Sequence, residues 1–109
     1  MSEGPEFTTV AKVGDIPSGE GKAYAVNGRM VAVFNEAGEY FAIDDFCPHM
    51  GASLAGGPLH KGVVSCPWHA WRFCIHDGQW CDNPRLKVDS FPLRVTGDEI
   101  QVQVAPRAT

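Results

Sequence analysis

The sequence lacks several features that are typical of nucleic-acid-binding, membrane and secreted proteins. With 9 Lys and Arg against 13 Asp and Glu, its formal net charge is −4, and it has no basic stripe that could neutralise phosphates. No apolar run approaches the length of a membrane span, and residues 1–6 lack the charged and apolar regions of a signal peptide. We therefore expect neither nucleic acid nor a membrane as a partner. We also expect a cytoplasmic location, where thiols stay reduced and cysteine clusters usually bind metal.

Helical periodicity is missing as well. No stretch combines apolar residues three and four positions apart with a helix cap, whereas short apolar runs separated by turn residues are frequent. Asn27-Gly28 and Gly97-Asp98 are the clearest hairpin turns. At 109 residues the chain is long enough for one small domain. These patterns predict an all-β domain with strands at residues 7–13, 23–26, 30–34, 40–43, 63–64, 71–75, 79–81, 91–95 and 99–104.

Cysteine and histidine occur together in two short motifs, Cys47-Pro48-His49 and Cys66-Pro67-Trp68-His69. Each motif supplies one thiolate and one imidazole. This is the ligand set of a Rieske [2Fe–2S] centre, in which histidines replace the cysteines on one of the two irons. Soft thiolates suit the inner iron and neutral imidazoles suit the outer one. The motifs therefore predict one [2Fe–2S] cluster per chain, bound by Cys47, His49, Cys66 and His69.

Three other interpretations of these motifs fit less well. Structural zinc accepts two cysteines and two histidines, but it usually takes the two cysteines from one knuckle and the two histidines from another. A cysteine–histidine nucleophile uses one pair and leaves the second unexplained. A disulfide between Cys47 and Cys66 leaves both histidines without a role, and a reducing compartment disfavours it. Zinc remains an alternative to the cluster.

The segments around the two motifs make the family resemblance plain. Residues 47–54, 62–69 and 71–73 resemble the ligand loops of a Rieske-type ferredoxin, and the similarity extends over residues 7–104. The resemblance implies an all-β Rieske fold, with an antiparallel β-sandwich base of two sheets and an inserted cluster-binding β subdomain. It places residues 1–44 and 85–109 in the base and residues 45–84 in the subdomain. Residues 50–62, rich in glycine, are expected to be irregular backbone.

The same resemblance implies a function. Such ferredoxins are electron carriers and not enzymes; they accept electrons from a flavin-dependent ferredoxin reductase and pass them to a terminal oxygenase. We expect the chain to act in this way as a soluble monomer. The alternative is the small Rieske subunit of a larger redox enzyme, such as an assimilatory nitrite reductase.

Differences from high-potential Rieske proteins bear on the redox potential. Those proteins carry an additional disulfide between the two ligand loops, where this chain has Ala52 and Trp68. They also place a serine where this chain has Trp71. Both features stabilise the reduced cluster, so their absence indicates a resemblance to the low-potential ferredoxins.

The remaining cysteines and histidines are expected to stay outside the site. If Asp77-Gly78 is a two-residue turn, Cys74 lies directly opposite Cys81, close enough for a disulfide, although two reduced thiols fit a cytoplasmic protein better. His60 lies in the glycine-rich segment and His76 beside the hairpin turn, and both are predicted to be bystanders.

Overall fold

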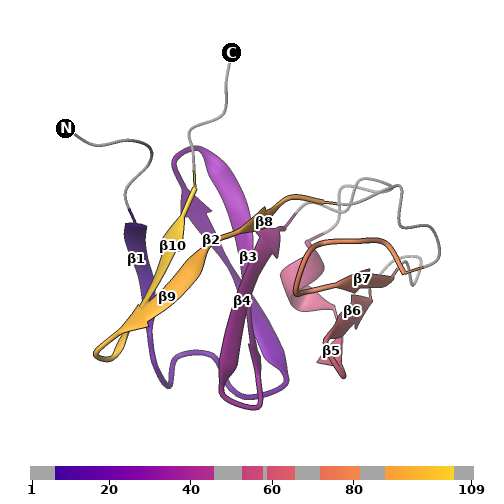
Figure 1. Cartoon of the computed structure of the whole chain (residues 1–109), viewed down its shortest axis with the longest axis horizontal. Coiled ribbons are helices and arrows are strands. Elements are labelled where there is room, and N and C mark those ends of the chain that lie inside the picture. The colour runs from indigo at the N-terminus through magenta and orange to yellow at the C-terminus, as the bar shows by residue number, and fades with distance from the viewer. Residues whose placement is uncertain (1–6, 46–52, 58, 66–71, 82–87, 105–109) are drawn as a thin grey trace.

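The computed structural model describes residues 7–45, 53–57, 59–65, 72–81 and 88–104. These residues form ten strands, arranged in three antiparallel sheets, and a single turn of 3-10 helix. Figure 1 shows the two larger sheets packed side by side, with the third and smallest sheet beside them at the right. The prediction of an all-β fold with three antiparallel sheets is confirmed.

The largest sheet has the strand order β2-β3-β4-β8 and contains two tight hairpins. Asn27-Gly28 joins the first pair of strands with φ values of 51° and 81°, so the turn predicted there is confirmed. Ala37-Gly38 joins the second pair with φ values of 54° and 94°. Both central residues of a type I′ turn need positive φ, which is why Asn-Gly is favoured at such positions. The strands are β2 (Glu20–Val26), β3 (Arg29–Glu36), β4 (Glu39–Asp44) and β8 (Ser90–Phe91).

The second sheet has the order β1-β10-β9, so the first strand of the chain pairs with the last one. It contains β1 (Phe7–Lys12), β9 (Leu93–Thr96) and β10 (Glu99–Gln103). The predicted closing hairpin around Gly97-Asp98 is present, but the single strand predicted at residues 91–95 was wrong. Phe91 ends β8 in the first sheet and Leu93 begins β9 in the second, because Pro92 has no amide proton to continue either ladder.

The third sheet lies within the segment that carries both cysteine–histidine motifs. It has the order β5-β6-β7, and it follows the 3-10 turn η1 in the chain. The prediction that residues 50–62 are irregular was wrong in the part that the structure describes, which includes η1 and β5. Leu54 and Ala55 are buried, and this packing gives the short segment a regular form that its glycine-rich composition conceals. The elements are η1 (Leu54–Gly56), β5 (Leu59–His60), β6 (Val63–Ser65) and β7 (Arg72–Cys74).

Strand β3 forms the centre of the molecule because both of its faces are buried. Alternate side chains of a strand point to opposite faces of the sheet, so Val31 and Val33 enter one core while Ala32 and Phe34 enter the other. The first core lies between the two larger sheets, and the second lies between the largest sheet and the third sheet. The described members of the second core are Ala32, Phe34, Ile43, Leu54, Ala55, Val64, Phe73, Ile75 and Val88. The third sheet is therefore held by apolar side chains from the largest sheet.

In the parts of the chain that the structure describes, no helix has the length and hydropathy needed to cross a membrane.

Candidate metal centre

The four predicted ligands, Cys47, His49, Cys66 and His69, lie outside the described residues. Within the described residues, no group of three or more His, Cys, Asp or Glu side chains could hold a metal ion. The structure does describe the residues on either side of each ligand segment, at 45 and 53 and at 65 and 72. These flanking residues are the anchors of the two segments, because they hold the ends of each segment in place.

Asp45 anchors the first ligand segment. The residue is 5% exposed, and one carboxylate oxygen accepts hydrogen bonds from the Ser53 hydroxyl at 2.9 Å and from the Ala55 amide at 2.8 Å. The Asp45 carbonyl also accepts a bond from the Leu54 amide at 2.8 Å. These bonds connect the residue before the segment to the residues directly after it. Hydrogen bonds to a buried carboxylate are among the stronger ones in proteins, so the two ends of residues 46–52 are held together.

The second ligand segment is closed by a strand pair. Ser65, the last residue of β6, pairs with Arg72, the first residue of β7. The ladder continues through Val64 with Phe73, and both of these side chains are fully buried in the second core. Residues 66–71 therefore connect two paired strands, and their ends are fixed by backbone hydrogen bonds and by apolar packing.

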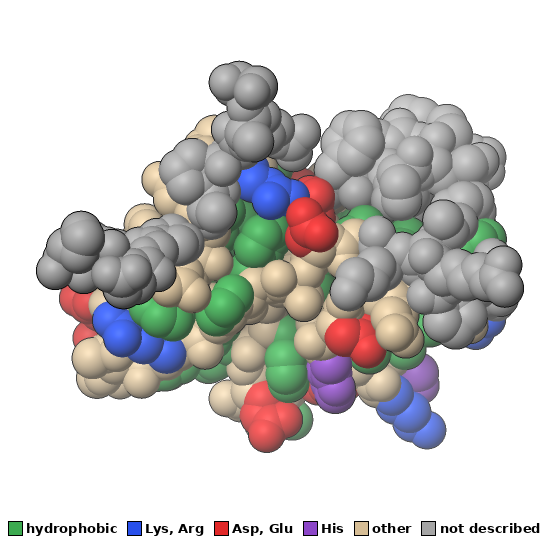
Figure 2. All heavy atoms as spheres, turned by 45° about the horizontal axis from the view of Figure 1, so that its top comes forward, with side chains coloured by type: hydrophobic (Ala, Val, Ile, Leu, Met, Phe, Trp, Pro, Cys, Tyr) green, Lys and Arg blue, Asp and Glu red, His purple; other side chains and the backbone are tan. Residues whose placement is uncertain are grey.

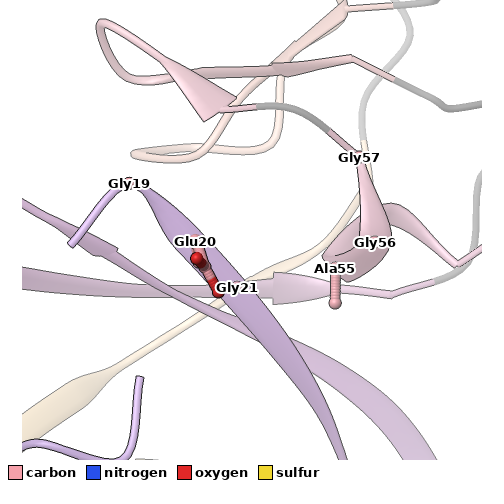
Figure 3. A pocket seen from close by; sticks show the side chains of 6 residues that line it. All are labelled: Gly19, Glu20, Gly21, Ala55, Gly56 and Gly57. Atoms are coloured by element: carbon pink, nitrogen blue, oxygen red, sulfur yellow. The ribbon is translucent and has the colours of Figure 1, made fainter. Parts of the chain in front are cut away.

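The two anchors are in direct contact at Gly57. A Cβ atom added to Gly57 would lie 1.8 Å from the carbonyl oxygen of Ser65, closer than any side chain can approach. Glycine is therefore required at this position, and it brings the end of η1 against the last residue of β6. Figure 3 shows Gly56 and Gly57 across from Gly19, Glu20 and Gly21 at the start of β2. The open groove that these residues line has a volume of about 430 Å³. The residues that line the groove are Gly19, Glu20, Gly21, Ala55, Gly56 and Gly57.

An ion pair holds the chain where the ligand-bearing segment leaves the largest sheet and returns to it. The Arg29 guanidinium donates to Asp89 at 2.8 Å and to Asp44 at 3.1 Å. The hydrogen bond to Asp89 raises the pKa of Arg29 most strongly, and Asp44 raises it further, against the opposing effect of burial. Asp44 ends β4 just before the segment, and Asp89 precedes β8 just after it. Arg29 therefore joins both crossing points.

His76 connects the third sheet to the largest one. Its ring stacks on Phe41, with 4.3 Å between the ring centroids and 24° between the planes. Its Nε2 atom lies 3.4 Å from a carboxylate oxygen of Glu36. This contact could not be predicted from the sequence, because Phe41 and His76 are 35 positions apart. His60 is exposed on β5.

Cys74 and Cys81 are free thiols. The expectation that they lie directly opposite each other was wrong, because the turn at Asp77-Gly78 is longer than two residues. Phe73 pairs with Trp80, and the Cys74 amide donates to the Gln79 carbonyl at 2.8 Å. Gly78 packs against the backbone of Val88, and the two are joined by a hydrogen bond of 2.9 Å from the Val88 amide. This contact accounts for the wider turn.

Comparisons with known proteins agree with these observations over almost the whole chain. A family model described as the Rieske [2Fe–2S] domain matches residues 6–92. The biphenyl dioxygenase ferredoxin subunit of Pseudomonas sp. (strain KKS102) is 36% identical over 106 residues, which cover 94% of this chain and 95% of that protein. The ferredoxin of carbazole 1,9a-dioxygenase from Nocardioides aromaticivorans IC177 is similar in structure, with a TM-score of 0.84 and 30% identity over 93% of this chain and 98% of the other. A structure described as the NADH-dependent nitrite reductase small subunit of Mycobacterium tuberculosis has a TM-score of 0.87 and 28% identity, over 94% of this chain and 99% of the other.

Proposed function

Because this chain belongs to the Rieske [2Fe–2S] domain family, we propose that it takes single electrons from a flavin-dependent ferredoxin reductase and delivers them to a terminal oxygenase. The interpretation as an electron carrier and not an enzyme agrees with its relatives, which are ferredoxin components of oxygenase systems. The observation that carries the proposal is the pair of motifs with one cysteine and one histidine each, in a chain whose similarity to such ferredoxins extends over its full fold.

We assign the ligands by residue type. Cys47 and Cys66 bind the inner iron as thiolates, and His49 and His69 bind the outer iron as neutral imidazoles. The donor set fits the cofactor, because two thiolates cancel the formal charge of plus two on a core of two ferric ions and two sulfides. When bound, the cluster accepts and releases one electron. Histidine ligation gives it a potential of about −150 to +300 mV, against about −400 mV for four-cysteine plant-type ferredoxins.

The residues that hold the ligand segments support this role. Asp45 and the Ser65–Arg72 pair fix the ends of the two segments, and Gly57 brings those anchors into contact. Rigid anchors keep ligands near one geometry in both redox states, which a carrier needs for rapid transfer. We also propose that residues 45–84 are a cluster-binding subdomain inserted into a base of residues 1–44 and 85–109. Arg29 supports this division, since it bridges the two crossing points.

The second candidate function is the small subunit of a larger redox enzyme. It is favoured by the structural similarity to the nitrite reductase small subunit, which is as extensive as that to the oxygenase ferredoxins. The two functions differ in their assembly. A free carrier is a monomer in the cytoplasm, and it purifies alone with one cluster. A subunit stays associated with its enzyme during purification. Sedimentation of the protein purified from its native cells distinguishes them.

The test of the ligand assignment is the metal content of purified protein. We expect a red-brown protein with two irons and two acid-labile sulfides per chain, and a rhombic EPR signal after reduction. Alanine at any one of Cys47, His49, Cys66 and His69 should abolish the signal, whereas Cys74→Ala and His60→Ala should leave it intact. A colourless protein with stoichiometric zinc, made with iron available, would contradict the assignment.

A further inference from the structure

Asp45 places a carboxylate beside the first ligand segment, two residues before the proposed ligand Cys47. A chain extends by at most about 3.6 Å per residue, so the Cα atoms of these two residues lie within about 7 Å of each other. Asp45 is 5% exposed, and salt screens a buried charge much less than a solvated one. The carboxylate is therefore close enough to influence the charge state of a cluster that is bound at Cys47.

The groups that bond the Asp45 side chain are neutral. One carboxylate oxygen accepts the hydrogen bonds from the Ser53 hydroxyl and the Ala55 amide, at 2.9 Å and 2.8 Å. Among the described residues, no cation pairs with Asp45, and the Arg29 guanidinium is bonded to two other carboxylates. Neutral donors leave the formal charge of a carboxylate unchanged. Within the described part of the chain, no ion pair therefore compensates the negative charge at this anchor.

The other acidic side chains differ from Asp45 in their exposure. Figure 2 shows acidic side chains at separate places on the surface of the molecule. Water and salt screen such charges, over about 8 Å at physiological ionic strength. The buried polar residues of the described part of the chain are Asn35 and Asp45, so Asp45 is the one carboxylate that these residues bury. Its field is therefore screened least.

We propose that the charge of Asp45 lowers the reduction potential of the bound cluster. The proposal rests on the cluster and the carrier function proposed above, and it adds a residue that tunes them. With the donor set assigned above, the oxidised site is formally neutral and the reduced site carries one negative charge. A nearby negative charge repels the added electron and disfavours reduction. A unit charge on the order of 10 Å away, at an effective dielectric constant of about 20, changes such an equilibrium by about tenfold.

The hydrogen bonds provide a substitution that removes the charge and keeps the anchor. Both bonds end on the same carboxylate oxygen, and no described residue donates to the other oxygen. Asp45→Asn keeps one acceptor oxygen for both donors. Ser53→Ala does the opposite, because it removes one donor and keeps the charge. Asp98→Asn is the matched control, since Asp98 is an exposed aspartate in the turn between β9 and β10 in the second sheet.

The experiment is a redox titration of the purified holoproteins at constant pH and salt, followed by the visible spectrum and by EPR. At a fixed applied potential, we expect Asp45→Asn to raise the ratio of reduced to oxidised protein by roughly three- to tenfold. A tenfold change corresponds to about 59 mV for a one-electron couple. Ser53→Ala should leave the ratio unchanged or lower it, because the lost donor no longer offsets part of the field of the carboxylate. Asp98→Asn should match the wild type.

Two results would overturn the proposal. One is that Asp45→Asn has the same midpoint as Asp98→Asn and the wild type. The other is that Ser53→Ala raises the ratio as Asp45→Asn does, which shows that the geometry of the anchor and not its charge sets the potential. If Asp45→Asn binds no iron, Ser53→Ala decides alone: a raised ratio overturns the proposal, and any other result supports it. A wild-type protein without a one-electron couple refutes the proposed cluster and carrier function instead, so the two failures are distinguishable.

Discussion

Replacing Gly57 by alanine tests whether contact between the two anchors is needed for cluster binding. The new methyl group would lie 1.8 Å from the carbonyl oxygen of Ser65 and 3.0 Å from its carbonyl carbon. Both atoms belong to the backbone, so no side-chain rotation can relieve the contact. Ser65 is followed directly by Cys66, one of the four proposed ligands, and a displacement at Ser65 is therefore expected to reach the proposed site.

The size of the displacement follows from the geometry. Real Cβ contacts are essentially never shorter than 3.0 Å, so η1 and β6 must separate by about 1.2 Å at this point. The residues of a functional site must stay within about 0.5 Å of their productive positions, which is less than half of that movement. Overpacking of this kind costs about 2–3 kcal/mol of unfolding free energy. We therefore expect Gly57→Ala to be less stable than the wild type and to contain clearly less than two irons per chain.

Gly56→Ala is the matched control, one residue away in the same 3-10 turn. A Cβ atom at Gly56 meets nothing within 4 Å, and the residue does not have positive φ. Alanine there reduces the freedom of the unfolded chain and should stabilise the protein by about 0.4–1 kcal/mol. Iron and sulfide analysis, the visible spectrum and urea unfolding of both variants provide the measurement. Full iron content and equal stability in the two variants would refute the argument that Gly57 sets the spacing of the anchors.

Three further predictions concern the interface of the sheets, alkaline stability and the redox potential. His76→Ala should lose the stacking on Phe41 and lower the unfolding free energy by about 0.5–1 kcal/mol, while the visible spectrum stays unchanged; a change in the spectrum would place His76 at the site. Burial, assisted by the charge of Asp15, raises the pKa of the Tyr24 hydroxyl above 10.0. The neutral Tyr24 side chain therefore contributes fully to the unfolding free energy below about pH 10, and this contribution is lost as the pH rises through the pKa of the folded state. Tyr24→Phe should therefore lose less stability than the wild type in strongly alkaline urea titrations, and identical profiles would exclude this contribution. Because the ligand loops have Ala52, Trp68 and Trp71 where high-potential Rieske proteins have two cysteines and a serine, direct voltammetry should give a midpoint of about −150 to 0 mV at pH 7 that falls at alkaline pH. A midpoint well above +100 mV would contradict this explanation.

The sequence was sufficient to predict those features that depend on neighbouring residues. Asn27-Gly28 predicted its hairpin because the positive φ values of a type I′ turn are local requirements. The short apolar run at residues 30–34 beside Asn27-Gly28 indicated a strand, although its two buried faces became apparent only from the packing of the sheets. The cysteine–histidine motifs predicted the ligand set from chemistry alone, and that assignment stays a prediction until metal is measured.

Features that depend on distant contacts could not be predicted. Asp77-Gly78 has the composition of a two-residue turn, but the turn after Cys74 is wider, and Gly78 is bonded to Val88, ten positions along the chain. Asp45 was recognised as the start of the ligand-bearing segment, yet its role as an anchor depends on burial and on Ser53. An aspartate before a cysteine motif carries no local signal that distinguishes a buried anchor from a solvated charge.

The closure of each ligand segment at its base has a consequence for protein engineering and for divergence within the family. Residues 46–52 begin and end at the bonds between Asp45 and Ser53, and residues 66–71 begin and end at the Ser65–Arg72 pair. Each segment can therefore be exchanged as a cassette between these fixed points while the strands beneath keep their register. Substitutions between these fixed points can change potential or partner choice while the anchors themselves are kept, so one β scaffold can serve redox systems with different requirements.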